Sequence, residues 1–264
     1  MRMLAKSLAV VALSVAPWCV DRAHADGGGT VAGQFVFDGE VPKLAPLVKE
    51  GDGNVKNAEV CAKQAVPDES LIVDPSSKGI ANIFVYLQKP PAGMPADLKE
   101  SKDKVVKFDQ HNCRFIPHAL ILRTDQSIEV LSDDPISHNT HVNPIRQDGK
   151  NQVLSPNDRS GSVKWEFTVP ERLPIKVNCD IHAWMSANWL IIDHPYAAIT
   201  DKDGKFKIEN VPAGEHKFLI WHERSGYVFG ADKRSIPVTV EAGKTTQLGN
   251  AASISVPAAN FEKK

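Results

Sequence analysis

Clusters of Gly, Pro, Asn and Asp interrupt this chain at close spacing, and short apolar or alternating runs stand between them. Runs of this kind are typical of β-strands. No long stretch keeps the period of an amphipathic helix with capping residues at its ends. We therefore expect an all-β protein built as a sandwich or barrel.

The pattern also gives approximate element positions. Only two short pieces, residues 57–64 and 96–102, look helical, and the prolines around Gly93 mark a loop or linker between two units. The chain from Tyr196 onward reads as a compact meander. The expected strands cover residues 30–37, 80–87, 104–108, 118–123, 127–131, 161–168, 173–177, 188–192, 205–208, 216–221 and 236–240.

Charge excludes one class of partner. The chain has 31 Lys plus Arg and 32 Asp plus Glu, and the basic residues are scattered along it. A nucleic-acid-binding surface needs clustered basic residues, so we expect no nucleic acid partner. No stretch is long and apolar enough for a transmembrane segment.

The first 25 residues have the layout of a secretory signal peptide. Arg2 and Lys6 precede an apolar run over residues 8–15, and small residues surround a cleavage site after Ala25. A lipid anchor on Cys19 is the alternative, but the bulky Trp18 stands where such a site requires a small residue. We expect an exported protein that is periplasmic or associated with the cell envelope.

Export changes the meaning of the cysteine count. Of the four cysteines, Cys19 lies in the expected signal peptide, so Cys61, Cys113 and Cys179 remain. An odd number of cysteines in an oxidising compartment leaves at least one thiol outside a disulfide.

Cys179 belongs to a spacing that suits a metal. Cys179, His182 and Met185 form a Cys-x-x-His-x-x-Met sequence between two expected strands, and a turn there can aim the three side chains at one point. Copper is held in some proteins by two His and one Cys with a long axial Met. His138, at the end of the loop after another expected strand, is the candidate for the second histidine, with His141 and His118 as alternatives.

Other readings of these residues remain. Cys179 and Met185 are also the kind of residues that fill a core, with His182 at the surface. A zinc site is disfavoured because methionine is a poor zinc ligand. A thiol nucleophile would need a neighbouring base and a substrate cleft, which the sequence does not require.

Residues 105–194 resemble the cupredoxins, the blue copper proteins of the plastocyanin and amicyanin type. Besides the ligand spacing, the resemblance rests on the Phe115-Ile-Pro-His118 and Asp125-to-Val130 segments and on the His138-Asn139 pair. It implies a Greek-key β-sandwich over residues 103–194 and one copper ion. It also implies that Asn139 braces the cysteine loop, and that the ligands are His138, Cys179, His182 and Met185.

The resemblance leaves two cysteines to account for. With Cys179 as the copper thiolate, Cys61 and Cys113 are expected to form a disulfide. Two separately buried thiols are the alternative.

A second, smaller sandwich is expected around this domain. Residues 196–221 resemble the carboxypeptidase regulatory-like β-sandwich, related to transthyretin, and residues 29–39 are similar to its first strand. This domain would be discontinuous, formed by residues 26–102 and 195–258. The resemblance implies a binding or scaffolding module without peptidase activity.

Together these features predict a one-electron carrier that cycles between Cu(I) and Cu(II) and is not an enzyme. Its expected partner is a redox protein, a cytochrome or a dehydrogenase. Electrons are expected to enter through an exposed edge of His182. The expected docking patch beside it includes Ala183, Trp184, Pro135 and Ile136. The alternatives are copper storage or delivery, and binding of an envelope ligand with a secondary metal site.

Overall fold

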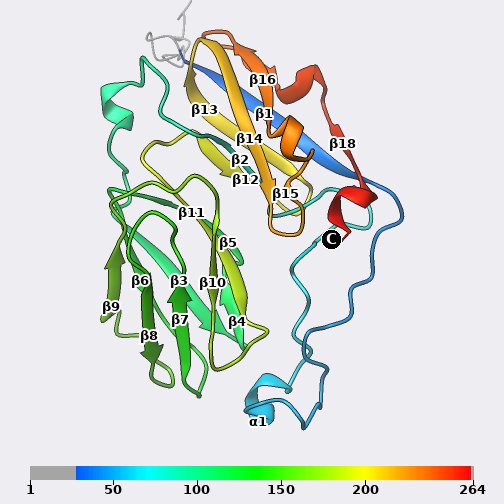
Figure 1. The fold of residues 1–264 in the computed structure, drawn as a ribbon, viewed down its shortest axis with the longest axis vertical. Helices are drawn as coiled ribbons and strands as arrows, with labels where there is room; N and C mark the ends of the chain where they lie inside the picture. The colour runs from blue at the N-terminus through cyan, green and yellow to red at the C-terminus, as the bar shows by residue number, and fades with distance from the viewer. Residues whose placement is uncertain (1–27, 263–264) are drawn as a thin grey trace, which may run out of the picture.

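The computed structural model describes residues 28–262, which fold almost entirely into strands. This confirms the expected all-β class. The strands form four sheets that pair into two sandwiches, called here the upper and the lower sandwich from their places in Figure 1. The expected signal peptide, residues 1–25, lies outside the described residues.

The upper sandwich contains both ends of the described chain. Its first sheet consists of β1 (Gly28–Asp38), β13 (Lys205–Pro212), β17 (Thr245–Gln247) and β18 (Ile254–Pro257). Its second sheet consists of β2 (Phe84–Leu87), β12 (Ala197–Ile199), β14 (Gly214–His222), β15 (Gly226–Tyr227) and β16 (Ser235–Val240).

The lower sandwich is built from the middle of the chain. One sheet contains β5 (Ala119–Arg123), β7 (His138–Val142), β8 (Lys150–Leu154), β10 (Ile175–Asn178) and β11 (Ser186–Ile192). The other contains β3 (Val105–His111), β4 (Arg114–Ile116), β6 (Ser127–Val130) and β9 (Val163–Glu166).

Helical structure among the described residues is short. Within residues 28–262 the one α-helix is α1 (Ala58–Cys61), inside the expected helical piece 57–64. The other expected piece contains a 3-10 helix, Ala96–Leu98. Further 3-10 turns lie at Ala231–Lys233, Leu248–Asn250 and Ala258–Phe261. No helix in residues 28–262 has the length and apolar character needed to cross a membrane.

Each sandwich has its own apolar core, produced by strand alternation. In β1 every second side chain is buried, and Val31, Phe35 and Phe37 join the upper core. In the lower core the Trp189 ring meets the Phe108 ring edge-on, with the ring centroids 4.7 Å apart. Edge-on packing of this kind is a favourable arrangement of aromatic rings. It fixes β11 against the opposite sheet.

Two strands are buried on both faces and join the sandwiches. In β2, Val85 and Leu87 face the upper core, whereas Phe84 and Tyr86 belong to a third cluster with Leu190 of β11. A continuous apolar run is typical of a strand covered on both sides. The two sandwiches are therefore packed on each other through an apolar layer.

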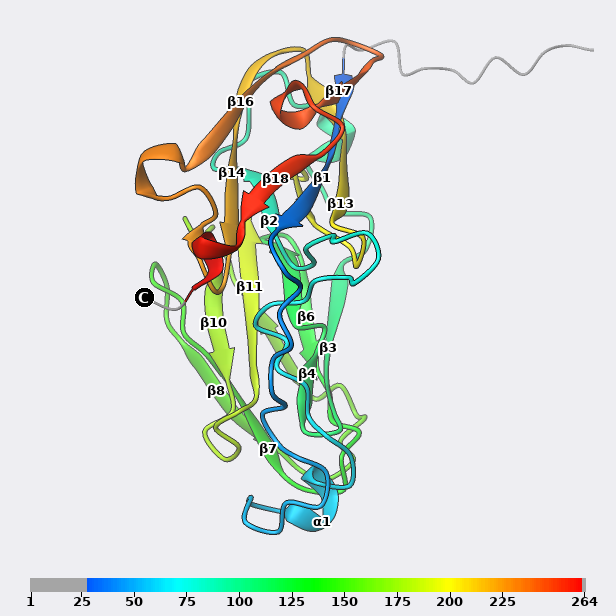
Figure 2. The ribbon, with the colours of Figure 1, turned by 90° about the vertical axis from the view of Figure 1, so that its right-hand side faces the viewer.

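The chain between β1 and β2 makes a long excursion. It leaves the upper sandwich, runs along the lower sandwich to its far end, forms α1 there and returns (Figure 2). Residues far apart in the sequence thus meet at that end.

The expected strands are present with shifted ends, and several others were missed. His138, expected at the end of a loop, instead begins β7. Strand β8 was missed because it is an edge strand in which Asn151, Gln152 and Val153 are exposed, which removes the alternation. The division into domains at residues 103 and 194, and the likeness of the upper sandwich to a carboxypeptidase regulatory-like domain, stay predictions.

Candidate metal centre

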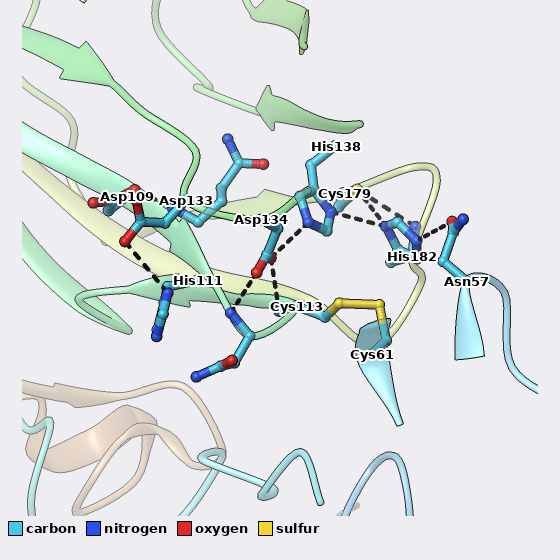
Figure 3. Close-up of polar contacts among 12 residues, drawn as sticks. Asn57, Cys61, Asp109, His111, Cys113, Asp133, Asp134, His138, Cys179 and His182 are labelled. Atoms are coloured by element: carbon cyan, nitrogen blue, oxygen red, sulfur yellow. Dashed lines mark hydrogen bonds and ion pairs between the residues drawn. A yellow bond between two sulfur atoms is a disulfide. The ribbon is translucent and has the colours of Figure 1, made fainter. Parts of the chain in front are cut away.

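Three predicted ligands meet at the far end of the lower sandwich. His138 begins β7, and Cys179 and His182 lie in the loop between β10 and β11. One ligand atom from each, a ring nitrogen or the thiol sulfur, lies within 4.8 Å of the other two. The Nδ1 atoms of the two histidines are 2.9 Å apart, and His182 Nδ1 is 3.8 Å from Cys179 Sγ (Figure 3). All three side chains are buried.

The loop that carries Cys179 is closed by its own backbone. The Cys179 amide donates to the Met185 carbonyl at 3.2 Å, and the Met185 amide donates to the His182 carbonyl at 2.9 Å. The His182 amide points at Cys179 Sγ, 3.4 Å away. Met185, the fourth predicted ligand, is buried in the core cluster that contains Cys179. The short spacing therefore folds into a compact turn between two strands.

Hydrogen-bond acceptors beside the Nε2 atoms of His138 and His182 determine which ring nitrogens carry the proton and which can bind a metal. His138 Nε2 is 2.8 Å from Asp134 Oδ2, and His182 Nε2 is 3.0 Å from Asn57 Oδ1. A carboxylate and an amide oxygen accept hydrogen bonds, so each Nε2 carries a proton and donates. Each Nδ1 atom therefore turns its lone pair toward the other ring and Cys179, as metal-binding histidines do.

Asp134 is a buried carboxylate with several donors. The Asn112 and Cys113 amides donate to it at 2.7 and 2.8 Å, in addition to His138. Burial raises the pKa of the Asp134 carboxyl, but these hydrogen bonds outweigh burial and hold the pKa below its usual value. For His138, burial lowers the pKa, and Asp134 and Cys179 outweigh it and raise the pKa.

Cys179 is the free cysteine of the described chain. Burial raises the pKa of its thiol, whereas the neighbouring His138 and His182 rings lower it, and the net effect is a pKa of about 6. The thiolate is the form that binds metals, so the two histidines favour the form that a metal needs.

Asn139 holds the cysteine loop in place. Its Oδ1 accepts from the Asp180 amide at 2.7 Å and the Ile181 amide at 3.3 Å, and lies 3.3 Å from Cys179 Sγ. Its Nδ2 donates to Asp180 Oδ2 at 2.9 Å. The bracing role expected of Asn139 is therefore confirmed.

The disulfide expected from the resemblance is also present. Cys61 and Cys113 are bonded, with their Cα atoms 5.4 Å apart. This bond joins α1, at the tip of the excursion, to the turn between β3 and β4 beside Asp134 (Figure 3).

The expectation that one edge of the His182 ring is exposed to solvent is wrong. The side chain is completely buried, because Asn57 and the residues around it cover the face that was expected to meet solvent. Of the expected docking patch, Ala183 and Pro135 are exposed, and Trp184 is half-buried.

The two alternative histidines lie elsewhere. His141 is partly exposed, and its Nδ1 is 3.1 Å from Asp180. His118 pairs with Glu223 of the upper sandwich. Neither is in the group formed by His138, Cys179 and His182.

Asp134 and Asn57 were not identified from the sequence. Asp134 had a weak signal, because a carboxylate four residues before a candidate ligand can lie beside it. Asn57 had none, because 125 positions separate it from His182.

No protein-family model matches this sequence, and no curated protein matches it. Among solved structures, a copper-containing nitrite reductase from Thermus scotoductus SA-01 is 18% identical, with a TM-score of 0.29, over 33% of this chain and 22% of that one. A reduced amicyanin mutant is 12% identical, with a TM-score of 0.28, over 35% and 86%. A purple cupredoxin from Nitrosopumilus maritimus is 17% identical, with a TM-score of 0.26, over 34% and 99%. Likeness at this level does not assign ligands or partners, so the chemistry rests on the residues.

Proposed function

We propose that this protein binds one copper ion at His138, Cys179, His182 and Met185 and transfers single electrons between exported redox proteins. The observation that carries the proposal is the convergence of two Nδ1 atoms and a thiol of lowered pKa in one buried site. In the metal-free protein a proton can occupy the space between the facing nitrogens, and a cation can replace it. The soft donor set of imidazole, thiolate and thioether favours copper.

Copper bound in such a site would supply one-electron chemistry, and the protein's part is to keep the ligands still. Asp134 and Asn57 hold the two rings by their Nε2 atoms. Asn139 holds the backbone just after Cys179 through the Asp180 and Ile181 amides, and the lower core packs around the site. A rigid, dry site changes little when an electron arrives or leaves, which favours fast transfer.

The partner and the location belong to the same proposal. The expected signal peptide points to export, and the redox partner would be a cytochrome or a dehydrogenase. Ala183 and Pro135, which remain exposed near the site, are the proposed docking area. We also propose a carboxypeptidase regulatory-like domain over residues 26–102 and 195–258, which includes the upper sandwich and acts as a scaffold for the copper domain over residues 103–194.

Copper storage or delivery is the second candidate. The complete burial of His182 favours it, because an electron partner cannot approach that ring directly. Voltammetry of the copper-loaded chain from Asp26 separates the two functions. A reversible one-electron wave, absent in Cys179→Ser, supports electron transfer. A protein that binds copper, gives no reversible wave and passes the ion quickly to a chelator would be a storage or delivery protein.

A further inference from the structure

The tip of the excursion between β1 and β2 is a small folded unit, residues 47–66, called here the cap. Its two ends pair, because the Leu47 amide donates to the Val66 carbonyl at 2.8 Å and the Val66 amide donates to the Val48 carbonyl at 2.9 Å. Val48, Ala62 and Val66 form a separate apolar cluster within it. The cap therefore has its own internal order.

Two attachments hold the cap against the cysteine loop. Trp184, between His182 and Met185, packs on the apolar cluster of the cap, and its Nε1 donates to the Cys113 carbonyl at 3.2 Å. The Cys61–Cys113 disulfide ties α1 to the same place. A crosslink that closes a long loop limits how far the attached segment can move.

Asn57 is the point where the cap reaches His182. It lies just before α1 with φ 54°, a left-handed conformation that asparagine adopts more readily than most residues. Its Oδ1 faces His182 Nε2 (Figure 3). Its Nδ2 lies 3.5 Å from Glu59 Oε1. The acceptor on Glu59 fixes which end of the amide faces the ring.

We propose that the cap is a tethered lid over the centre, and that Asn57 is the positioning residue that closes it and holds His182 as the Nε2–H tautomer. The part that concerns metal binding rests on the proposed function; the shielding of Cys179 does not. The cap replaces solvent at the ring edge, so reagents and metal ions reach Cys179 only when the cap moves away. A half-open pocket of about 30 Å³ beside the cap, whose lining includes Leu47, Val66 and Met185, leaves room for about one or two water molecules.

The first test uses the metal-free chain from Asp26, in which Cys179 is the free thiol. Its rates of reaction with a bulky aromatic disulfide reagent and with iodoacetamide are measured together. The access ratio is the rate with the bulky reagent divided by the rate with iodoacetamide. Because both reagents need the thiolate, the thiolate fraction cancels and the ratio reports how easily a bulky molecule reaches Cys179. Asn57→Gly removes the amide and keeps the left-handed backbone accessible. We expect it to raise the ratio about tenfold, because one hydrogen bond closes the lid.

Matched variants separate the amide from general loosening. Asn54→Gly is the control, because Asn54 lies in the cap but bonds only to Asp52 among the described contacts. Asn57→Asp keeps an acceptor oxygen, so its access ratio should be as low as that of the native chain. The double variant Cys61→Ser, Cys113→Ser should raise the ratio further, by about a hundredfold. If that variant does not fold, the Asn57 series decides.

The second test reads the tautomer directly. Nitrogen-15 shifts of His182 in the metal-free protein should show a proton on Nε2 in the native chain and in Asn57→Asp, and a mixture of tautomers in Asn57→Gly. The proposal would be overturned if Asn57→Gly had the same access ratio and the same His182 tautomer as the native chain. Absence of copper binding by the native chain would instead refute the proposed function, and the two tests of the cap would still stand.

Discussion

The Nδ1 atoms of His138 and His182 face each other at 2.9 Å, and each ring is held from behind by an acceptor on its Nε2 atom. The acceptor for His138 is a buried carboxylate of the same sandwich, whereas the acceptor for His182 comes from the cap. Facing lone pairs repel unless a proton or a metal ion lies between them. The arrangement is therefore prepared for a cation before one arrives.

Asp134→Asn should weaken copper binding by about 10- to 100-fold, the usual effect of losing a partner behind a metal-bound histidine. The amide is neutral, and its NH2 group would face the Asn112 amide if it replaced Oδ1, or the Cys113 amide and His138 Nε2–H if it replaced Oδ2. Loss of the negative charge should also raise the reduction potential, because Cu(II) loses more stabilisation than Cu(I). Competition with a chelator of known affinity and voltammetry measure the two effects.

Asp133→Asn is the matched control for this prediction. Asp133 is the neighbouring residue, but it is exposed and contacts His111 and Arg159 at the surface. The copper affinity of Asp133→Asn should stay within about twofold of that of the native chain, because losing a weak surface ion pair has an effect of that size. Equal losses of copper affinity in Asp134→Asn and Asp133→Asn would mean that the net charge of the protein matters and that the position of Asp134 behind His138 does not.

Asn139→Ala should destabilise the metal-free protein by about 1–3 kcal/mol, since it leaves the Asp180 and Ile181 amides without their acceptor. Urea denaturation measures the change. Asn151→Ala, which removes an exposed partner of Asp180, should cost less. A larger loss in Asn151→Ala would show that the surface cluster, and not Asn139, holds the loop.

The local part of the site could be predicted because residues this close in the sequence also lie close together in the folded protein. Cys179, His182 and Met185 lie within one turn, and the strands on either side can be recognised from their apolar runs. The disulfide followed once Cys179 had another role. His138 was identified because it ends a polar loop segment, although it belongs to β7.

The environment of the site could not be predicted, because it depends on contacts between distant residues. The exposed edge expected for His182 assumed a centre open to solvent, and the cap from residues 47–66 closes it. Nothing around Asn57 signals that role, since it is 125 positions away from His182 and its helix has only four residues. Strand β8 was missed for a related reason, because its pairing with β7 leaves most of its side chains exposed.

His222 in the upper sandwich should make the protein acid-sensitive. Burial lowers the pKa of its imidazole from 6.5 to about 4, and His118 and Arg224 add to this against the opposing effect of Glu223. Below pH 6.5 the unfolded chain takes up the proton and the folded chain does not. This contribution to stability is therefore fully present above pH 6.5 and is lost as the pH falls toward 4, by about 3 kcal/mol in total.

Urea denaturation of His222→Gln between pH 4 and 7 measures this effect. The difference in unfolding free energy between the native chain and the variant should change with pH in that window and be constant above it. His216→Gln, at a half-buried position on the same strand β14, is the control for loss of a histidine. A pH-independent difference for His222→Gln would refute the assignment.

Addition of Cu(II) to the metal-free chain from Asp26, followed by visible absorption, tests the central claim most directly. A thiolate bound to Cu(II) in a two-histidine site should give an intense visible band that saturates at one copper per chain. Cys179→Ser should abolish the band. A colourless copper form, or a band that Cys179→Ser leaves unchanged, would contradict the account.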